Sequence, residues 1–169
     1  MLTRSKLLLA LVAAASVAML SGCGSGPAKT PTPKKPIAER RAVEIIARGI
    51  SKEKLTAEDG RTIKISGTSL RMDVGVTGKK FGVAYVTSND LDEPGGDKIP
   101  KKDPKRPGAL VLVEGVGDDA DARCLVLYDT DYLSDDSTDE YKTTTITAEA
   151  ALERDVRDFV VQAKAKKWD

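Results

Sequence analysis

Hydrophobic and polar residues alternate with a period of two through the middle of the chain. In the first alternating segment, Ile63 and Ile65 lie on one face and polar residues on the other. Three segments share this pattern: 61–66, 69–77 and 80–88. A period of two is typical of strands with one buried face. The links between them, Gly67-Thr68 and Gly78-Lys79, are so short that they predict antiparallel hairpins.

Two later segments, 109–116 and 123–129, are apolar on both faces. They are typical of central strands that are covered on both sides, or of strands at a domain junction. The polar residues 117–122 between them predict a turn. Residues 142–147, "KTTTIT", are consistent with a sixth, exposed strand.

Apolar residues recur at helical spacing in two segments that flank the strands, 37–50 and 148–168. We expect Thr147 to cap the second helix, in which acidic residues precede basic ones as the helix dipole favours. Its apolar stripe predicts packing on the sheet, and the alternative is a helix that lies on a membrane with Trp168 at the interface.

The order of helix, five or six strands and helix predicts one α+β domain over residues 37–169. Short links favour an antiparallel five- or six-stranded sheet with the N-terminal and the C-terminal helix packed on it, in two layers. Residues 23–36, which are rich in Gly, Pro and Lys, predict an extended tether before this domain.

The amino terminus has the pattern of a secretory signal peptide. Arg4 and Lys6 precede an apolar run over residues 7–20. This run is too short for a comfortable bilayer span, which needs roughly 20 residues. The predicted signal peptide covers residues 1–22.

The run ends in Leu20-Ser21-Gly22-Cys23. This sequence resembles the lipobox of bacterial lipoproteins, an apolar residue and two small residues before a cysteine. The resemblance covers residues 1–23 only. It implies cleavage between Gly22 and Cys23, and a thioether-linked diacylglycerol on Cys23 that holds the chain to a membrane. A plain signal peptide and an uncleaved anchor are the alternatives.

The lipobox resemblance also implies an address in the cell envelope. Gly24 follows the cysteine, where an Asp often retains a lipoprotein in the inner membrane of diderm bacteria. We therefore expect the outer membrane in a diderm, and the outer face of the plasma membrane in a monoderm.

Charge and composition exclude some classes of function. Residues 1–22 contain two basic and no acidic residues, so their removal takes the formal net charge from +1 to −1. This balance does not favour nucleic-acid binding. The chain has no histidine, which excludes Ser-His-Asp catalysis and most zinc sites. With Cys23 lipidated, Cys124 is the remaining thiol, and its apolar neighbours predict a buried residue rather than a reactive one.

Residues 89–108 form a long link without apolar periodicity, acidic in the first half and basic in the second. Links of this length are usually functional or disordered. We expect either a solvated mobile loop or a recognition loop for an envelope protein or polymer.

Residues 129–140, "DTDYLSDDSTDE", crowd carboxylates together. The spacing partly matches an EF-hand loop but lacks its central glycine. The alternatives are a solubilising acidic loop and a weak calcium site, whose predicted ligands are Asp129, Asp131, Asp135 and Glu140.

The sequence thus predicts a membrane-anchored envelope lipoprotein that acts as a binding or structural module. It predicts no cofactor other than weakly bound calcium. The alternative is a small envelope enzyme that uses carboxylates, such as Asp73, Asp129 or Asp131, or the thiol of Cys124.

Overall fold

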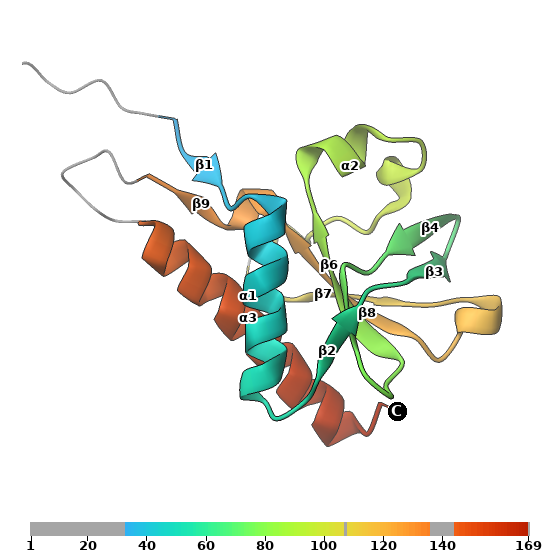
Figure 1. Ribbon diagram of the computed structural model, residues 1–169. Helices are drawn as coiled ribbons and strands as arrows, with labels where there is room; N and C mark the ends of the chain where they lie inside the picture. The colour runs from blue at the N-terminus through green and yellow to red at the C-terminus, as the bar shows by residue number, and fades with distance from the viewer. Residues whose placement is uncertain (1–32, 107, 136–143, 169) are drawn as a thin grey trace, which may run out of the picture. The chain divides into compact units, whose positions relative to one another are not determined.

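Strands and helices of the computed structural model follow the predicted order, with additional short elements (Figure 1). The structure describes residues 33–106, 108–135 and 144–168. The strands are β1 (Lys35–Pro36), β2 (Ala57–Asp59), β3 (Thr62–Ile65), β4 (Thr68–Arg71), β5 (Val74–Val76), β6 (Phe81–Val86), β7 (Val111–Glu114), β8 (Arg123–Tyr128) and β9 (Leu133–Ser134). The helices are α1 (Glu39–Lys52), α2 (Ser88–Asp92) and α3 (Thr145–Lys166), with 3₁₀ turns η1 (Gly96–Lys98), η2 (Gly117–Asp119) and η3 (Asp129–Asp131).

The main sheet has five strands in the order β2-β5-β6-β8-β7. Its neighbours pair antiparallel except β6 and β8, which run parallel in a six-residue register from Phe81↔Arg123 to Val86↔Tyr128. The predicted α+β class is confirmed, but the prediction of a purely antiparallel sheet is wrong. The sheet is mixed because the chain crosses from β6 to the far edge strand β7 before it returns through β8.

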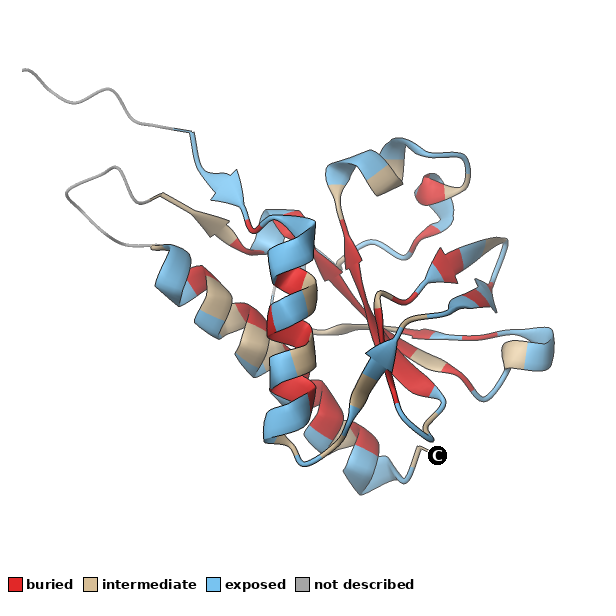
Figure 2. Ribbon diagram, viewed as in Figure 1, coloured by how far each residue is buried: buried red, intermediate tan, exposed pale blue. Residues whose placement is uncertain are grey.

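Helices α1 and α3 cover one face of this sheet (Figures 1 and 2). They bury an apolar core against β5, β6 and β8, which we call the helix-side core. Phe159 of α3 is fully buried and meets Phe81 of β6 edge to face, with ring centroids 5.7 Å apart. Trp168 packs on Phe159 at 6.1 Å and is half-buried, so it belongs to this layer.

The opposite face of the sheet is covered by the tip of a bent hairpin. Strands β2 and β5 keep the same register as β3 and β4, and the bend falls between them at Gly60 and Asp73. The ladder continues through the bend, since the Gly60 N–H donates to the Asp73 carbonyl at 3.2 Å. Segment 69–77, which we predicted as one strand, is therefore divided into β4 and β5 by this bend.

The bend places two halves of one alternating pattern on opposite faces of the sheet. Leu70 and Met72 pack with Ala84 of β6 in a second cluster, which we call the hairpin-side core. Val74 and Val76, with the same parity in the sequence, lie in the helix-side core. Both faces of β6 and β8 are therefore buried, which the sequence predicted for β8 but not for β6.

Two features at the ends of the domain differ from the prediction. Helix α3 begins at Thr145, and Thr144 caps it by accepting the Thr147 N–H at 3.3 Å. The predicted exposed strand 142–147 is therefore wrong for 145–147, and 142–143 lie outside the described residues. The last residues of the predicted tether, 35–36, form β1 and pair antiparallel with β9.

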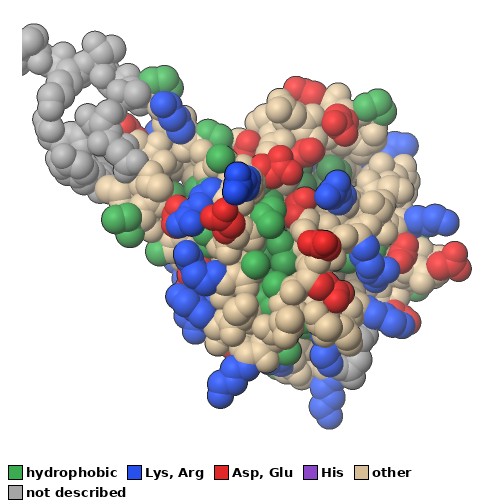
Figure 3. Space-filling model, viewed as in Figure 1, with side chains coloured by type: hydrophobic (Ala, Val, Ile, Leu, Met, Phe, Trp, Pro, Cys, Tyr) green, Lys and Arg blue, Asp and Glu red, His purple; other side chains and the backbone are tan. Residues whose placement is uncertain are grey.

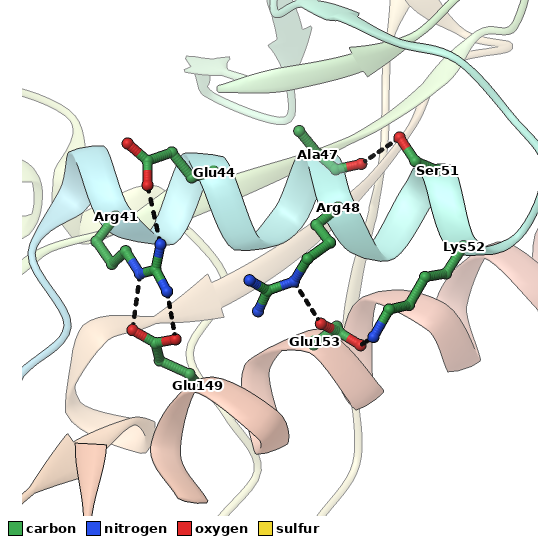
Figure 4. Close-up of polar contacts among 8 residues, drawn as sticks. All are labelled: Arg41, Glu44, Ala47, Arg48, Ser51, Lys52, Glu149 and Glu153. Atoms are coloured by element: carbon green, nitrogen blue, oxygen red, sulfur yellow. Dashed lines mark hydrogen bonds and ion pairs between the residues drawn. The ribbon is translucent and has the colours of Figure 1, made fainter. Parts of the chain in front are cut away.

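Ion pairs join the outer sides of α1 and α3 (Figure 4). The Arg41 guanidinium donates to both oxygens of Glu149 at 2.7 Å, and this hydrogen bonding lowers the pKa of Glu149. Further along, Glu153 accepts from Arg48 at 2.6 Å and also pairs with Lys52. Exposed pairs of this kind contribute about 0.2–1 kcal/mol each. Together they fix α1, whose first residue lines the cleft described next.

Candidate functional site

A cleft of about 430 Å³ opens between the amino end of α1, the bend of the hairpin and the segment that follows β6. We call it the acidic cleft. Among the described residues that line it, the acidic side chains are Glu39, Asp73, Asp90 and Glu93, and the cationic side chain is Arg71. In Figure 3, acidic side chains gather around the hollow between α1 and α2.

Asp73 occupies the inner wall of the acidic cleft because the hairpin bends there. Its carboxylate accepts the backbone N–H of Tyr85 at 2.7 Å, which ties the bend to the central strand β6. Burial raises the pKa of Asp73, the Tyr85 hydrogen bond opposes this shift, and the negative charge of Glu39 adds to it. The carboxylate is thus partly desolvated and faces other acids.

Asp90 is held by the first turn of α2. Thr87 caps this helix, since the Asp90 carboxylate accepts the Thr87 N–H at 2.6 Å while the Thr87 hydroxyl accepts the Asp90 N–H. This reciprocal arrangement is a capping box. It holds the acidic start of segment 89–108 against the cleft.

The described part of segment 89–108 is attached to the hairpin at several points. Gly95 approaches Thr68 so closely that a Cβ at Gly95 would lie 2.5 Å from the Thr68 hydroxyl. The Lys98 ammonium donates to the Gly67 carbonyl at 3.0 Å, and Ile99 is buried in the hairpin-side core. The segment therefore contains most of α2 and all of η1, and it forms one wall of the cleft, while most of its described residues are exposed. Whether it recognises a partner stays a prediction.

This arrangement is suited to a positively charged group. Four carboxylates around one cleft create a negative potential, and the low-dielectric walls strengthen it. Among the residues that the structure describes, no three acidic or cysteine side chains are grouped closely enough to hold a metal ion.

The predicted calcium ligands have separate structural partners. Asp129 is buried at 8% exposure and accepts the Ser88 N–H at 3.2 Å, while Asp131 pairs with Lys102 at 3.0 Å. Asp135 is half-buried, and Glu140 lies outside the described residues. Among the described residues, Asp129, Asp131 and Asp135 do not form a group that could hold a metal ion, and weak calcium binding stays a prediction.

The structure describes Cys124 but not Cys23. Cys124 lies in β8 at 0% exposure, and burial raises the pKa of its thiol well above the usual range. The prediction of a buried residue is confirmed, and this environment disfavours a nucleophilic thiol because thiolate formation and access are both suppressed. Cys23 and the predicted cleavage site after Gly22 lie outside the described residues.

Comparisons with known proteins give no relative. No protein family, curated protein or solved structure matches the chain. Within residues 33–168, apart from the undescribed gaps, no helix has the length and apolar character needed to cross a membrane.

The sequence pointed to the acids of the cleft separately but not to the cleft. Asp90 and Glu93 belong to the acidic half of segment 89–108, and Asp73 was a candidate carboxylate. Glu39 was missed because it reads as an ordinary first-turn residue of a helix. The bend at Gly60 and Asp73 and the close approach of Gly95 to Thr68 bring these residues to one place. Gly60 was the available signal for the bend.

Proposed function

We propose that the chain is a lipid-anchored protein of the bacterial cell envelope that acts as a binding module. The observation that carries this proposal is the order of features at residues 4–23: positive charges, an apolar run, two small residues and Cys23. An anchor with two or three acyl chains binds a membrane far more firmly than one chain, at about 0.8 kcal/mol per buried CH₂.

The chain after Cys23 supports the same proposal. Residues 24–32 are polar and rich in Gly and Pro, and the chain then enters strand β1. Nine residues reach about 30 Å when extended, at about 3.3 Å each. The anchored domain stands off the lipid by up to this distance, on the outer membrane of a diderm or the outer face of a monoderm plasma membrane.

Metabolic labelling with palmitate tests the anchor. The Cys23→Ala chain should take up no label and should keep its signal peptide. Cys124→Ala is the matched control, because it removes the other cysteine and leaves the lipobox intact. Equal labelling of Cys23→Ala and the parent would refute the anchor.

For the binding surface, we propose the acidic cleft, with a ligand that carries positive charge. Its support is the convergence of four carboxylates on one cleft, in which Arg71 is the one cation among the described lining residues. One wall belongs to segment 89–108, so an envelope protein or polymer with amine groups would contact that segment. A carboxylate-dependent enzyme would use the same cleft, with the partly buried Asp73 among its acids.

Calorimetry with a short lysine peptide tests the cleft on residues 33–169. A Glu39→Gln, Glu93→Gln double variant should bind the peptide roughly two- to thirtyfold more weakly, since exposed charge pairs contribute about 0.2–1 kcal/mol each. The control is Glu58→Gln with Asp118→Asn, which removes the same charge from exposed positions that do not line the cleft. Equal weakening in both variants would show only a general charge effect and would reject the cleft.

A further inference from the structure

Strand β4 of the bent hairpin has one paired side and one open side. It pairs antiparallel with β3, and no other described strand pairs with it. Directly after β4, the Met72 N–H donates to the Arg61 carbonyl on the β3 side at 2.9 Å. Hydrogen-bonding groups alternate between the two sides of an antiparallel strand. The N–H and C=O groups of Ser69 and Arg71 therefore point away from β3.

The open side of β4 faces the acidic cleft. Asp73 shows the direction, because its N–H donates to the Val83 carbonyl of β6 at 2.8 Å, on the side away from β3. The Asp73 carboxylate then accepts the next N–H on this side of β6, that of Tyr85, at 2.7 Å. Beyond Asp73 the two strands separate. All four residues of β4 and the end of β6 line the cleft between them.

The opposite wall of the cleft leaves the open side of β4 unused. In Figure 1, the segment that contains α2 and η1 lies on the side of β4 opposite to β3. It touches the hairpin at the tip, where Gly95 approaches Thr68 and Lys98 donates to Gly67. Among the described residues, none makes a hydrogen bond to the backbone of Ser69. The space of about 430 Å³ lies beside these free backbone groups.

The carboxylates of the acidic cleft are not neutralised by ion pairs. On the outer side of the helices, Glu149 and Glu153 are paired with arginines of α1. In the cleft, by contrast, none of the four carboxylates forms an ion pair with a described residue. Asp73 and Asp90 accept backbone N–H groups, which leaves their charge uncompensated. A ligand in the cleft meets free backbone groups on one side and negative charge around it.

We propose that the open side of β4 binds an extended segment of a partner protein as an additional strand, with basic side chains of that segment against the carboxylates of the acidic cleft. The inference rests on the proposed function of the cleft and adds the mode of binding. An extended peptide repeats its outward N–H and C=O groups at every second residue, which matches the interval between Ser69 and Arg71. Addition of a strand to an open sheet edge is a recurring mode of peptide recognition.

Substitutions at Ser69 test the backbone pairing. Ser69→Pro removes the outward N–H, and proline is tolerated at such a position of an edge strand. Ser69→Ala is the matched control, because it removes the same hydroxyl and keeps the N–H. Calorimetry with a short lysine peptide is carried out on the full chain, isolated from cells in detergent. Ser69→Pro should bind about two- to twelvefold more weakly than Ser69→Ala, as one lost hydrogen bond predicts. Equal affinities of the two variants overturn the proposal.

A change in the ligand keeps the proposal testable if Ser69→Pro fails to fold. A lysine peptide with methylated backbone nitrogens has the same charge but no backbone N–H donors. It should bind the parent chain at least about twofold more weakly than the unmodified peptide. Equal binding of both peptides overturns strand addition and leaves the acidic cleft as a site for any amine. If neither peptide binds, the proposed function of the cleft fails, and this proposal fails with it.

Discussion

Alanine at Gly60 should strongly destabilise the domain, because Gly60 lies inside the bend of the hairpin. A Cβ at this position would lie 1.7 Å from the carbonyl oxygen of Met72 and 2.6 Å from the carbonyl carbon of Asp73. These are backbone atoms, which cannot rotate away as a flexible side chain would. The chain must therefore open the bend by more than 1 Å, given ordinary contact distances of about 3.5 Å.

The loss of stability in Gly60→Ala can be estimated from the cost of overpacking a core. Overpacking a core typically costs about 1–3 kcal/mol, and backbone displacement lies at the upper end of that range. We expect Gly60→Ala to lower the free energy of unfolding by about 3 kcal/mol. At about 2–4 °C per kcal/mol for a domain near this size, the midpoint of thermal unfolding falls by about 6–12 °C.

The assay is urea unfolding of residues 33–169, with Gly108→Ala as the matched control. No atom lies within 4 Å of a Cβ built at Gly108, so this variant should be neutral or more stable by up to about 1 kcal/mol. Equal midpoints for Gly60→Ala and Gly108→Ala would refute the bend, and with it the placement of β3 and β4 over the sheet.

Two further predictions concern acidic groups. Burial raises the pKa of Asp73, so its ionisation lowers the stability of the fold as the pH rises from the unfolded pKa through the folded pKa. Asp73→Asn should therefore be more stable than the parent at neutral pH but not in strong acid. Urea midpoints that differ by the same amount at both pH values would contradict this prediction. Millimolar calcium should raise the thermal midpoint of residues 33–169 through binding to residues 129–140. If calcium raises the midpoint of the parent and of an Asp129→Asn, Asp131→Asn double variant equally, Asp129 and Asp131 are excluded as ligands.

The periodicity of apolar residues within a segment was enough to predict helices α1 and α3 and the local hairpin of β3 and β4. The alternation at Ile63 and Ile65 identified β3, and helical spacing around Ile46 and Phe159 identified α1 and α3. Each of these residues is buried, as its pattern requires. The hairpin contacts between β3 and β4 are equally local, so a two-residue link predicted them correctly.

Long-range pairing was not encoded in such local patterns. The parallel pairing of β6 with β8 depends on the path of residues 87–110, whose polar sequence indicates no direction. The second buried face of β6 had a signal in Ala84 and Val86, but small and apolar residues opposite Tyr85 also fit a half-buried strand. Residues 142–147 were predicted as an exposed strand, but Thr144 caps a helix that begins at Thr145.

The sequence identified some residues of the candidate site, but it did not show that they lie together in one cleft. Asp73 and Asp90 lie 17 positions apart in the printed sequence, in segments of different pattern. They meet because the hairpin bends at Gly60 and because Gly95 lets the following segment approach Thr68. Both causes are close backbone approaches, and neither produces a periodic signal in the sequence.

The lipid anchor is the central proposal, and the intact mass of the protein isolated from bacterial membranes tests it most directly. The predicted mass is that of residues 23–169 plus a diacylglyceryl group on Cys23, with or without a further acyl chain on its amine. Fragmentation should place all of the added mass on Cys23 and none on Cys124. A mass that retains residues 1–22, or a chain without lipid at Cys23, would contradict the proposal.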